Sequence, residues 1–285
     1  MLMHTPTPLR ILPDCSRRFG CKVYGKLEIY NFTGSHKDRE SQEIIKYAVS
    51  AGVRKLAIAS TGNAAISLAA YSYVHGLECH VHLPQGIALE RLAQIQAYRP
   101  VIHVASTYRE AFAECQEQCR REGMLDCNPG SRFEKLRGNS RLGAEIATRI
   151  KPGCMVCPTN NGTLLAGVWM GMKYRKLRPR MIAAVAKETR LAEGIAGFHR
   201  LEEPALSECL EESRGEVIEV TDPEIVEATR LLLKDGLIVE GAAAAAVASL
   251  NQLDLSSRSK VCCIITGSGL KFPNTIGELL RTGAV

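Results

Sequence analysis

The sequence contains no apolar run that approaches the roughly 20 residues of a membrane-spanning helix, so we expect no transmembrane segment. Aromatic residues are few, at 5% of the chain with one tryptophan, and they are not interleaved with a basic run. The net charge of +6 is spread along the chain, which makes nucleic-acid binding a weak hypothesis. Residues Met1 to Pro6 lack the charged and apolar regions of a secretory signal, which favours a cytoplasmic protein.

Cysteine is abundant, but its pattern excludes the usual structural roles. Among eleven cysteines there is one CxxC motif, Cys154–Cys157, and no second CxxC completes a zinc site. An odd number of cysteines without a secretory signal favours reduced thiols over a disulfide framework. Both this motif and Cys262-Cys263 lie in apolar segments that we interpret as buried strands. We therefore expect small buried thiols and no metal site.

The chain of 285 residues is long enough for one large or two modest domains with a substantial core. Short apolar segments alternate with helical patterns in both halves, which predicts an α/β fold with mostly parallel sheets covered on both faces. The composition shifts near Lys151-Pro152-Gly153, which we take as the boundary between two α/β halves. The expected elements include 38–51, 55–59, 64–75, 79–83, 88–97, 101–104, 108–122 and 142–150 in the first half, and 155–157, 164–174, 181–185, 217–220, 225–234, 241–250 and 261–265 in the second.

Three segments have weaker patterns. Residues 126–139 read as a loop, residues 187–215 as irregular, and residues 237–239 as a short strand before an alanine-rich helix. The first of these carries or adjoins four basic residues that could bind an anionic substrate group such as a phosphate, although a solvated loop explains them slightly better. These residues are Arg132, Lys135, Arg137 and Arg141.

Three small-residue turns follow expected strands and precede expected helices: 60–63, 159–163 and 266–269. Ligands of open α/β sheets bind at the carboxyl ends of strands, and helix N-termini bind anions. Lys37 follows a Gly-Ser turn and opens a helix with acidic residues in its first turns. Taken alone it is a solvated lysine, a phosphate-binding lysine or a Schiff-base lysine, and the spacing does not fit a Walker A loop. With the three turns, the pattern favours a cleft for an anionic ligand beside a lysine able to form an imine.

Six segments, in chain order, resemble motifs of the fold-type II pyridoxal-phosphate enzymes. Thr33–Arg39 is similar to the T-G-S-F-K-D-R segment of threonine synthases, with His36 in place of phenylalanine. The matches span nearly the whole chain and are more specific for the superfamily than for one reaction. The others are Thr7–Leu9 (T-P-L), Ser60–Ala65 (S-T-G-N), Thr159–Thr163 (the phosphate loop), Leu237–Ala243 (V-E-P-x-x-A-A) and Thr266–Lys271 (T-G-H-G-L-K).

The resemblance implies two three-layer α/β domains with pyridoxal 5'-phosphate in the cleft between them. The smaller, mobile domain would be residues 38–150, and the larger, cofactor-binding domain residues 1–37 and 151–285. It also implies a homodimer. Lys37 would hold the cofactor as a Schiff base and then remove the Cα proton of the substrate. The cofactor would also contact Asn63, Thr159, Asn160, Asn161, Gly162, Thr163 and Thr266, and the substrate would contact Ser60, Thr61, Gly62, Asn63 and Arg137.

The implied reaction is a β- or γ-elimination or replacement on a small amino acid, most similar to the conversion of O-phosphohomoserine and water to threonine and phosphate. A serine/threonine dehydratase and a cysteine- or cysteate-synthase-like enzyme would share the machinery. Departures from the motifs, such as Arg137 in place of a glutamate and Ser268 in place of a histidine, also leave a non-catalytic relative open. A nucleotide-binding protein is disfavoured because no G-x-G-x-x-G follows the first strand.

Overall fold

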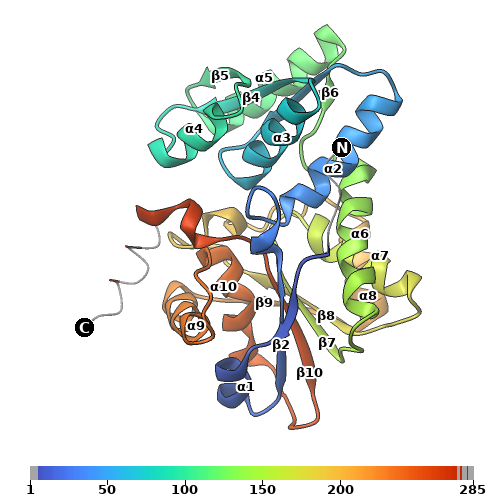
Figure 1. Cartoon of the computed structure of the whole chain (residues 1–285), viewed down its shortest axis with the longest axis vertical. Helices are drawn as coiled ribbons and strands as arrows, with labels where there is room; N and C mark the ends of the chain where they lie inside the picture. Colours follow the sequence, from blue (N-terminus) through green and yellow to red (C-terminus); the bar gives the residue numbers. More distant parts are fainter. Residues whose placement is uncertain (1–5, 275–276, 278–280, 282–285) are drawn as a thin grey trace. The chain divides into compact units, whose positions relative to one another are not determined.

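The computed structural model describes residues 6–274, 277 and 281, and the chain forms two compact units (Figure 1). Lys37–Gly138 form one, which we call the inserted unit. The described residues before and after it form the main unit. Each unit has its own sheet. The described sheet of the inserted unit is parallel and that of the main unit is parallel except for one edge strand, so the expected α/β class is confirmed.

The second boundary between the units lies after Gly138, inside helix α6 (Phe133–Ala147), whereas the sequence suggested Ile150. The reason is close packing of the later part of α6 on helix α7 (Thr163–Tyr174). A Cβ on Gly171 would lie 1.9 Å from the carbonyl oxygen of Ser140, and one on Gly143 would lie 2.2 Å from that of Val168. These contacts assign the second half of α6 to the main unit.

The main unit is built on a six-stranded sheet of the described residues, in which only the edge strand β1 is antiparallel. Successive residues of a strand face opposite sides, and two buried clusters result. Val156 and Cys263 face one cluster, while Met155 and Cys262 face the other. The strand order is β1 (Leu9–Ile11), β2 (Lys22–Leu27), β10 (Lys260–Ile265), β7 (Cys154–Pro158), β8 (Arg180–Val185) and β9 (Glu216–Glu219).

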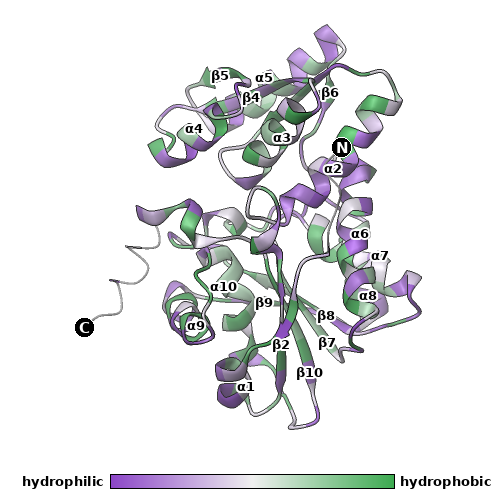
Figure 2. Cartoon of the chain, viewed as in Figure 1, coloured by the Kyte–Doolittle hydropathy of each residue, from purple (hydrophilic) through white to green (hydrophobic). Residues whose placement is uncertain are grey.

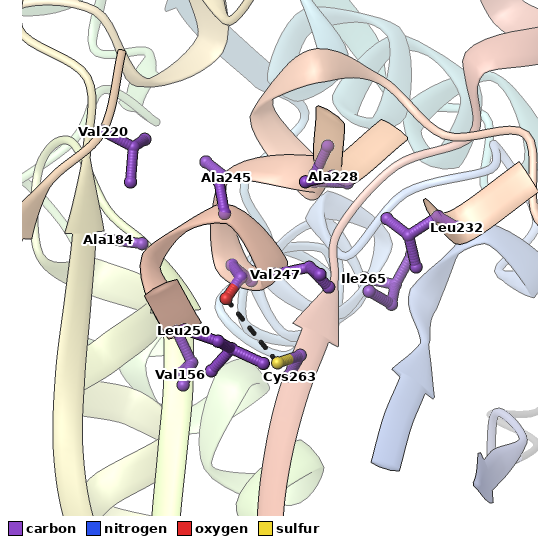
Figure 3. Packing of buried hydrophobic residues seen from close by; sticks show 14 of the residues in the cluster. Val156, Ala184, Val220, Ala228, Leu232, Ala245, Val247, Leu250, Cys263 and Ile265 are labelled. Atoms are coloured by element: carbon purple, nitrogen blue, oxygen red, sulfur yellow. Dashed lines mark hydrogen bonds between the residues drawn. The ribbon is translucent and has the colours of Figure 1, made fainter. Parts of the chain in front are cut away.

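Helices cover both faces of this sheet (Figure 1). On one face lie α1 (Pro13–Phe19), α9 (Asp222–Lys234) and α10 (Gly241–Ala248). On the other lie α6, α7 and α8 (Ala205–Ser213). The small side chains of α10 let it pack closely on β7 and β10, and the Cys263 thiol donates to the carbonyl oxygen of Ala246 at 3.6 Å (Figure 3). The strands and α10 are coloured as mainly hydrophobic in Figure 2, as expected for a buried layer.

The inserted unit is a three-layer arrangement around a four-stranded parallel sheet. Helix α5 packs on one face against Ala57 and Ala59, while Ile58 points to the other face with α2 and α3. The strand order is β5 (Val101–Ala105), β4 (Glu78–Pro84), β3 (Lys55–Ala59) and β6 (Leu125–Asp126). The helices are α2 (Lys37–Ser50), α3 (Asn63–Val74), α4 (Leu89–Gln96) and α5 (Tyr108–Glu122).

A row of three histidines, His80, His82 and His103, lies on the α5 face of the inserted sheet. His82 and His103 are register partners on β4 and β5, and their rings stack with centroids 4.3 Å apart. Nε2 of His82 lies 2.9 Å from Oε1 of Gln118, which can only accept, so the ring carries its proton on Nε2. Its Nδ1 is buried with no hydrogen-bond partner in the described part of the chain. Burial lowers the pKa of His82 from 6.5 to about 4 and also lowers that of His103.

Three expectations from the sequence need correction. Residues 126–139 are not all loop, because α6 begins at Phe133. Within 187–215, helix α8 forms, and it follows the short 3-10 helix η2 (Glu193–Ile195). Residues 237–239 are not a strand, because they pair only through the isolated bridge between Val239 and Ser268. The other 3-10 helices are η1 (Glu28–Tyr30), η3 (Ser249–Gln252) and η4 (Gly269–Lys271).

All eleven cysteines are buried and none forms a disulfide bond, as expected from their apolar surroundings. No group of metal-ligating side chains occurs among the described residues. Within the same residues, no helix is both long and apolar enough to span a membrane.

Candidate active site

Lys37 is the first residue of α2, directly after a turn in which Gly34 has a φ of 79°. Its Nζ lies 2.7 Å from Oε1 of Glu40, one helical turn further on. The Glu40 side chain is only 3% exposed, while that of Lys37 is 23% exposed. Asp38, which directly follows Lys37, is also buried, and its carboxylate accepts a hydrogen bond from the Ser67 hydroxyl at 2.7 Å. The helix start is therefore fixed by buried carboxylates, and Lys37 remains partly accessible.

Lys37 and Glu40 line a small hollow of the inserted unit. Lys135 lines it too, and its buried Nζ donates to the carbonyl oxygen of Cys127 at 2.5 Å. Burial raises the pKa of the Cys127 thiol, so this cysteine is a neutral wall of the hollow rather than a nucleophile. The remaining lining residues are Ser41, Ile44, Ile58, Ala64 and Leu68.

The turn of Ser60, Thr61 and Gly62 connects β3 to α3, whose first residue is Asn63. The first N–H groups of a helix have no intrahelical acceptor and can bind a carboxylate. A Cβ placed on Gly62 would meet no described atom within 4 Å, so there is room beside this turn. The inserted unit thus holds the predicted lysine together with the predicted carboxylate site.

The loop Thr159–Thr163 joins β7 to α7 in the main unit, and Gly162 adopts a left-handed φ of 93°. The Asn160 side chain holds the loop in place, since its Nδ2 donates to Ala196 and its Oδ1 accepts from the backbone of His199. Oδ1 of Asn161 is buried and lacks a hydrogen-bond partner among the described residues. The first N–H groups of α7 have no intrahelical acceptor, and with the left-handed Gly162 they make this loop suitable for a phosphate, whereas the amide oxygen of Asn161 is an acceptor and would not bind the anion.

A carboxylate that the sequence did not reveal reaches this loop. Oγ1 of Thr163 donates to Oε2 of Glu202 at 3.0 Å, and the Glu202 backbone N–H donates to the carbonyl oxygen of Asn161 at 2.9 Å. An anion in the loop would have to share the Thr163 hydroxyl with this carboxylate.

Thr266 follows β10, which runs parallel to β2 and β7, so segments 28–36, 159–163 and 266–269 emerge at the same edge of the main sheet. The N–H of His36 donates to the carbonyl oxygen of Thr266 at 2.9 Å, and that of Ser268 donates to Gly34 at 3.0 Å. Gly267 lies so close to the Glu240 carboxylate that a Cβ would fall 1.4 Å from its oxygen. The small residues of this turn are therefore needed for close packing, in addition to any role in binding a ligand.

The basic residues considered for an anionic substrate group have protein partners. Nε of Arg137 lies 2.8 Å from Oε2 of the buried Glu43. Arg132 pairs with Glu134 at 3.0 Å and stacks on the ring of Tyr47 at 4.3 Å. To bind an anion, Arg137 would have to exchange its carboxylate partner.

Comparison with known proteins agrees with this reading of the fold and the motifs. A family model described as "Pyridoxal-phosphate dependent enzyme" matches residues 1–267. The chain is 32% identical to threonine synthase of Halalkalibacterium halodurans over 94% of its own length and 83% of the relative's. It is 31% identical to threonine synthase of Methanocaldococcus jannaschii, over 94% and 75% of the two chains.

Solved structures share the fold at lower identity. Maize serine racemase superposes with a TM-score of 0.85 at 19% identity, covering 98% of this chain and 92% of that one. A fungal L-serine ammonia-lyase from Rhizomucor miehei gives 0.85 at 20% identity, covering 99% of both. Together with the family match over most of the chain, these findings establish that the protein belongs to the pyridoxal-phosphate-dependent enzymes of fold type II.

Proposed function

We propose that this enzyme catalyses a threonine-synthase-like reaction, in which a small amino acid loses a side-chain leaving group and water adds. The observation that carries the proposal is the set of relatives at 30–32% identity over 94–96% of the chain, which are threonine synthases. The structural neighbours named as deaminases, racemases and lyases are at most 21% identical, and they support the fold rather than the reaction.

The residues of the main unit fit the phosphate of the cofactor. The left-handed Gly162 and the N–H groups that open α7 provide what an anion cradle requires, a tight turn that presents hydrogen-bond donors. We assign Thr159–Thr163 to this phosphate, Thr266 to the pyridine nitrogen and Asn63 to the ring hydroxyl. Thr266 is 5% exposed and offers a hydroxyl instead of a carboxylate, which favours elimination over transamination.

Bound pyridoxal phosphate supplies an aldehyde carbon for the lysine and a conjugated ring that accepts charge from the Cα atom. Lys37 holds the cofactor through Nζ and, when released, takes the Cα proton of the substrate. The N–H groups around Ser60, Thr61 and Gly62 bind the substrate carboxylate and fix the Cα–H bond toward Lys37. Arg137 remains assigned to the substrate side, after exchange of its Glu43 partner. Assembly as a homodimer remains a prediction.

The test uses the protein reconstituted with pyridoxal phosphate, as wild type and as Lys37→Ala. We expect a lysine-linked visible band in the wild type, its absence in Lys37→Ala, and turnover lower by roughly 10³-fold or more. Lys46→Ala is the matched control, because Lys46 lies on the same helix and also pairs with a glutamate one turn away, at 2.9 Å. It should retain both the band and the activity.

A substrate panel of O-phosphohomoserine, O-phosphoserine, serine and threonine identifies the reaction. Release of threonine and phosphate from O-phosphohomoserine supports the proposal. A keto acid and ammonia from serine or threonine would instead assign a dehydratase, and phosphate release from O-phosphoserine with a nucleophile would assign a β-replacement enzyme. A band without turnover on any substrate would indicate a non-catalytic relative.

A further inference from the structure

The carboxylate of Glu40 is an unusual neighbour for an imine-forming lysine. Its side chain is 3% exposed, and its Oε1 lies 2.7 Å from Nζ of Lys37. The two residues are one turn apart at the start of α2, so the contact is set by the helix itself. A carboxylate at this distance is placed to exchange a proton with the lysine nitrogen.

Among the described residues that line the hollow, four carry a group that can exchange a proton: Lys37, Glu40, Lys135 and the thiol of Cys127. Lys135 is a cation whose Nζ donates to the carbonyl oxygen of Cys127, and burial raises the pKa of that thiol. The carboxylate of Glu40 is therefore the proton acceptor that this hollow offers to Lys37.

An ammonium group has no lone pair with which to attack an aldehyde, so Lys37 must lose a proton before it can hold the cofactor. We propose that Glu40 accepts this proton and returns it when the bond to the cofactor is completed. Glu40 is then a catalytic acid and base for cofactor attachment. This role rests on the proposed function, in which Lys37 is the attachment site.

The step balances as follows. The Nζ–H bond of the ammonium breaks, its electron pair stays on nitrogen, and a Glu40 oxygen gains the proton. The nitrogen pair then forms a bond to the aldehyde carbon, while the carbonyl electron pair moves to oxygen, which takes a second proton from the same nitrogen. Glu40 returns its proton to this hydroxyl, which leaves as water as the carbon–nitrogen double bond forms. Ammonium and aldehyde give iminium and water, and Glu40 is restored as a carboxylate.

The experiment measures how fast the cofactor-free protein captures pyridoxal phosphate as a function of pH. Capture is followed by the visible band and, after borohydride reduction, by the mass added at Lys37, so no turnover is needed. We expect Glu40→Gln to capture the cofactor at least about tenfold more slowly near neutral pH. The difference should shrink as pH rises, because hydroxide then removes the lysine proton without Glu40.

Glu117→Gln is the control, since Glu117 pairs with Arg120 at the same i,i+3 spacing on α5, outside the hollow. It should capture the cofactor at the wild-type rate. If Glu40→Gln does not fold, Glu40→Asp decides, because the shorter side chain withdraws the carboxylate and should slow capture several-fold with the same recovery at high pH. A wild-type rate and pH profile in the folded Glu40 variant would overturn the inference, whereas no capture by the wild type would overturn the proposed function itself.

Discussion

The histidine row of the inserted unit should make the stability of the protein fall in mild acid. The pKa of His82 is lowered from 6.5 to about 4, chiefly by burial and secondly by the charge of His103. Between these pH values the unfolded chain binds a proton that the folded chain refuses, so the free energy of unfolding decreases as pH falls. The structural reason is Nδ1 of His82, which is buried and has no hydrogen-bond partner among the described residues, so a proton there would find no acceptor.

The size of the effect follows from the shift. A lowering from 6.5 to about 4 corresponds to about 3 kcal/mol once the pH is below both values, and to about 2 kcal/mol near pH 5. The charged groups near His103 act on its pKa in both directions. The positive charge of His80 also lowers the pKa of His103, while Glu114 and Glu122 on α5 raise it, yet the net shift of His103 is downward. Its contribution therefore has the same sign as that of His82.

The variant that isolates this effect is His82→Gln. A glutamine amide keeps a donor for Oε1 of Gln118 but cannot titrate. Urea unfolding near pH 7.5 and near pH 5 should show the wild type losing about 2 kcal/mol more than the variant between the two conditions. Equal losses in the wild type and His82→Gln would refute the reasoning.

Two further changes test the main unit. Gly171→Ala should destabilise the protein by about 3 kcal/mol or more, because the new Cβ would fall 1.9 Å from the carbonyl oxygen of Ser140. Gly153→Ala is the control, because its Cβ would meet only a carbonyl oxygen at 3.9 Å, and it should be nearly neutral. Thermal unfolding measures the stability of both variants. Glu202→Gln removes the negative charge of the carboxylate that accepts a hydrogen bond from the Thr163 hydroxyl. It should strengthen pyridoxal-phosphate binding by roughly 1 kcal/mol in an equilibrium titration. Unchanged affinity would show that this carboxylate does not oppose the phosphate.

Local signals in the sequence accounted for much of the fold. Helix α5 was expected at 108–122 and spans those residues, because Thr107 caps its start and Gly123 ends it in a left-handed conformation. The start of α6 was missed, since Pro129 and Gly130 made the whole of 126–139 look like a loop. The boundary within α6 could not be read from the sequence, because it depends on which helix packs against it.

Motifs in the sequence identified Lys37 and the three turns as candidate site residues, and their roles remain predictions. The carboxylates beside them, Glu40 and Glu202, were not identified, because their partners depend on tertiary packing. Glu202 is far from Thr163 in the chain and meets it only through the fold. Glu40 had a local signal, the i,i+3 spacing to Lys37, but that spacing is common on solvated helices, and its burial is what gives it meaning.

The insertion of one unit into the other has a consequence for how the chain folds. Residues Lys37–Gly138 separate β2 from the later part of the main unit, yet the two ends of this insert lie together, since a Cβ on Gly138 would fall 2.3 Å from the carbonyl oxygen of Arg39. Once the insert has folded, it joins the two parts of the main unit as a short loop would, instead of as a flexible chain of about 100 residues. This lowers the entropic cost of bringing those two parts together by roughly 3 kcal/mol. Early folding of the insert would therefore speed assembly of the sheet that carries the phosphate loop.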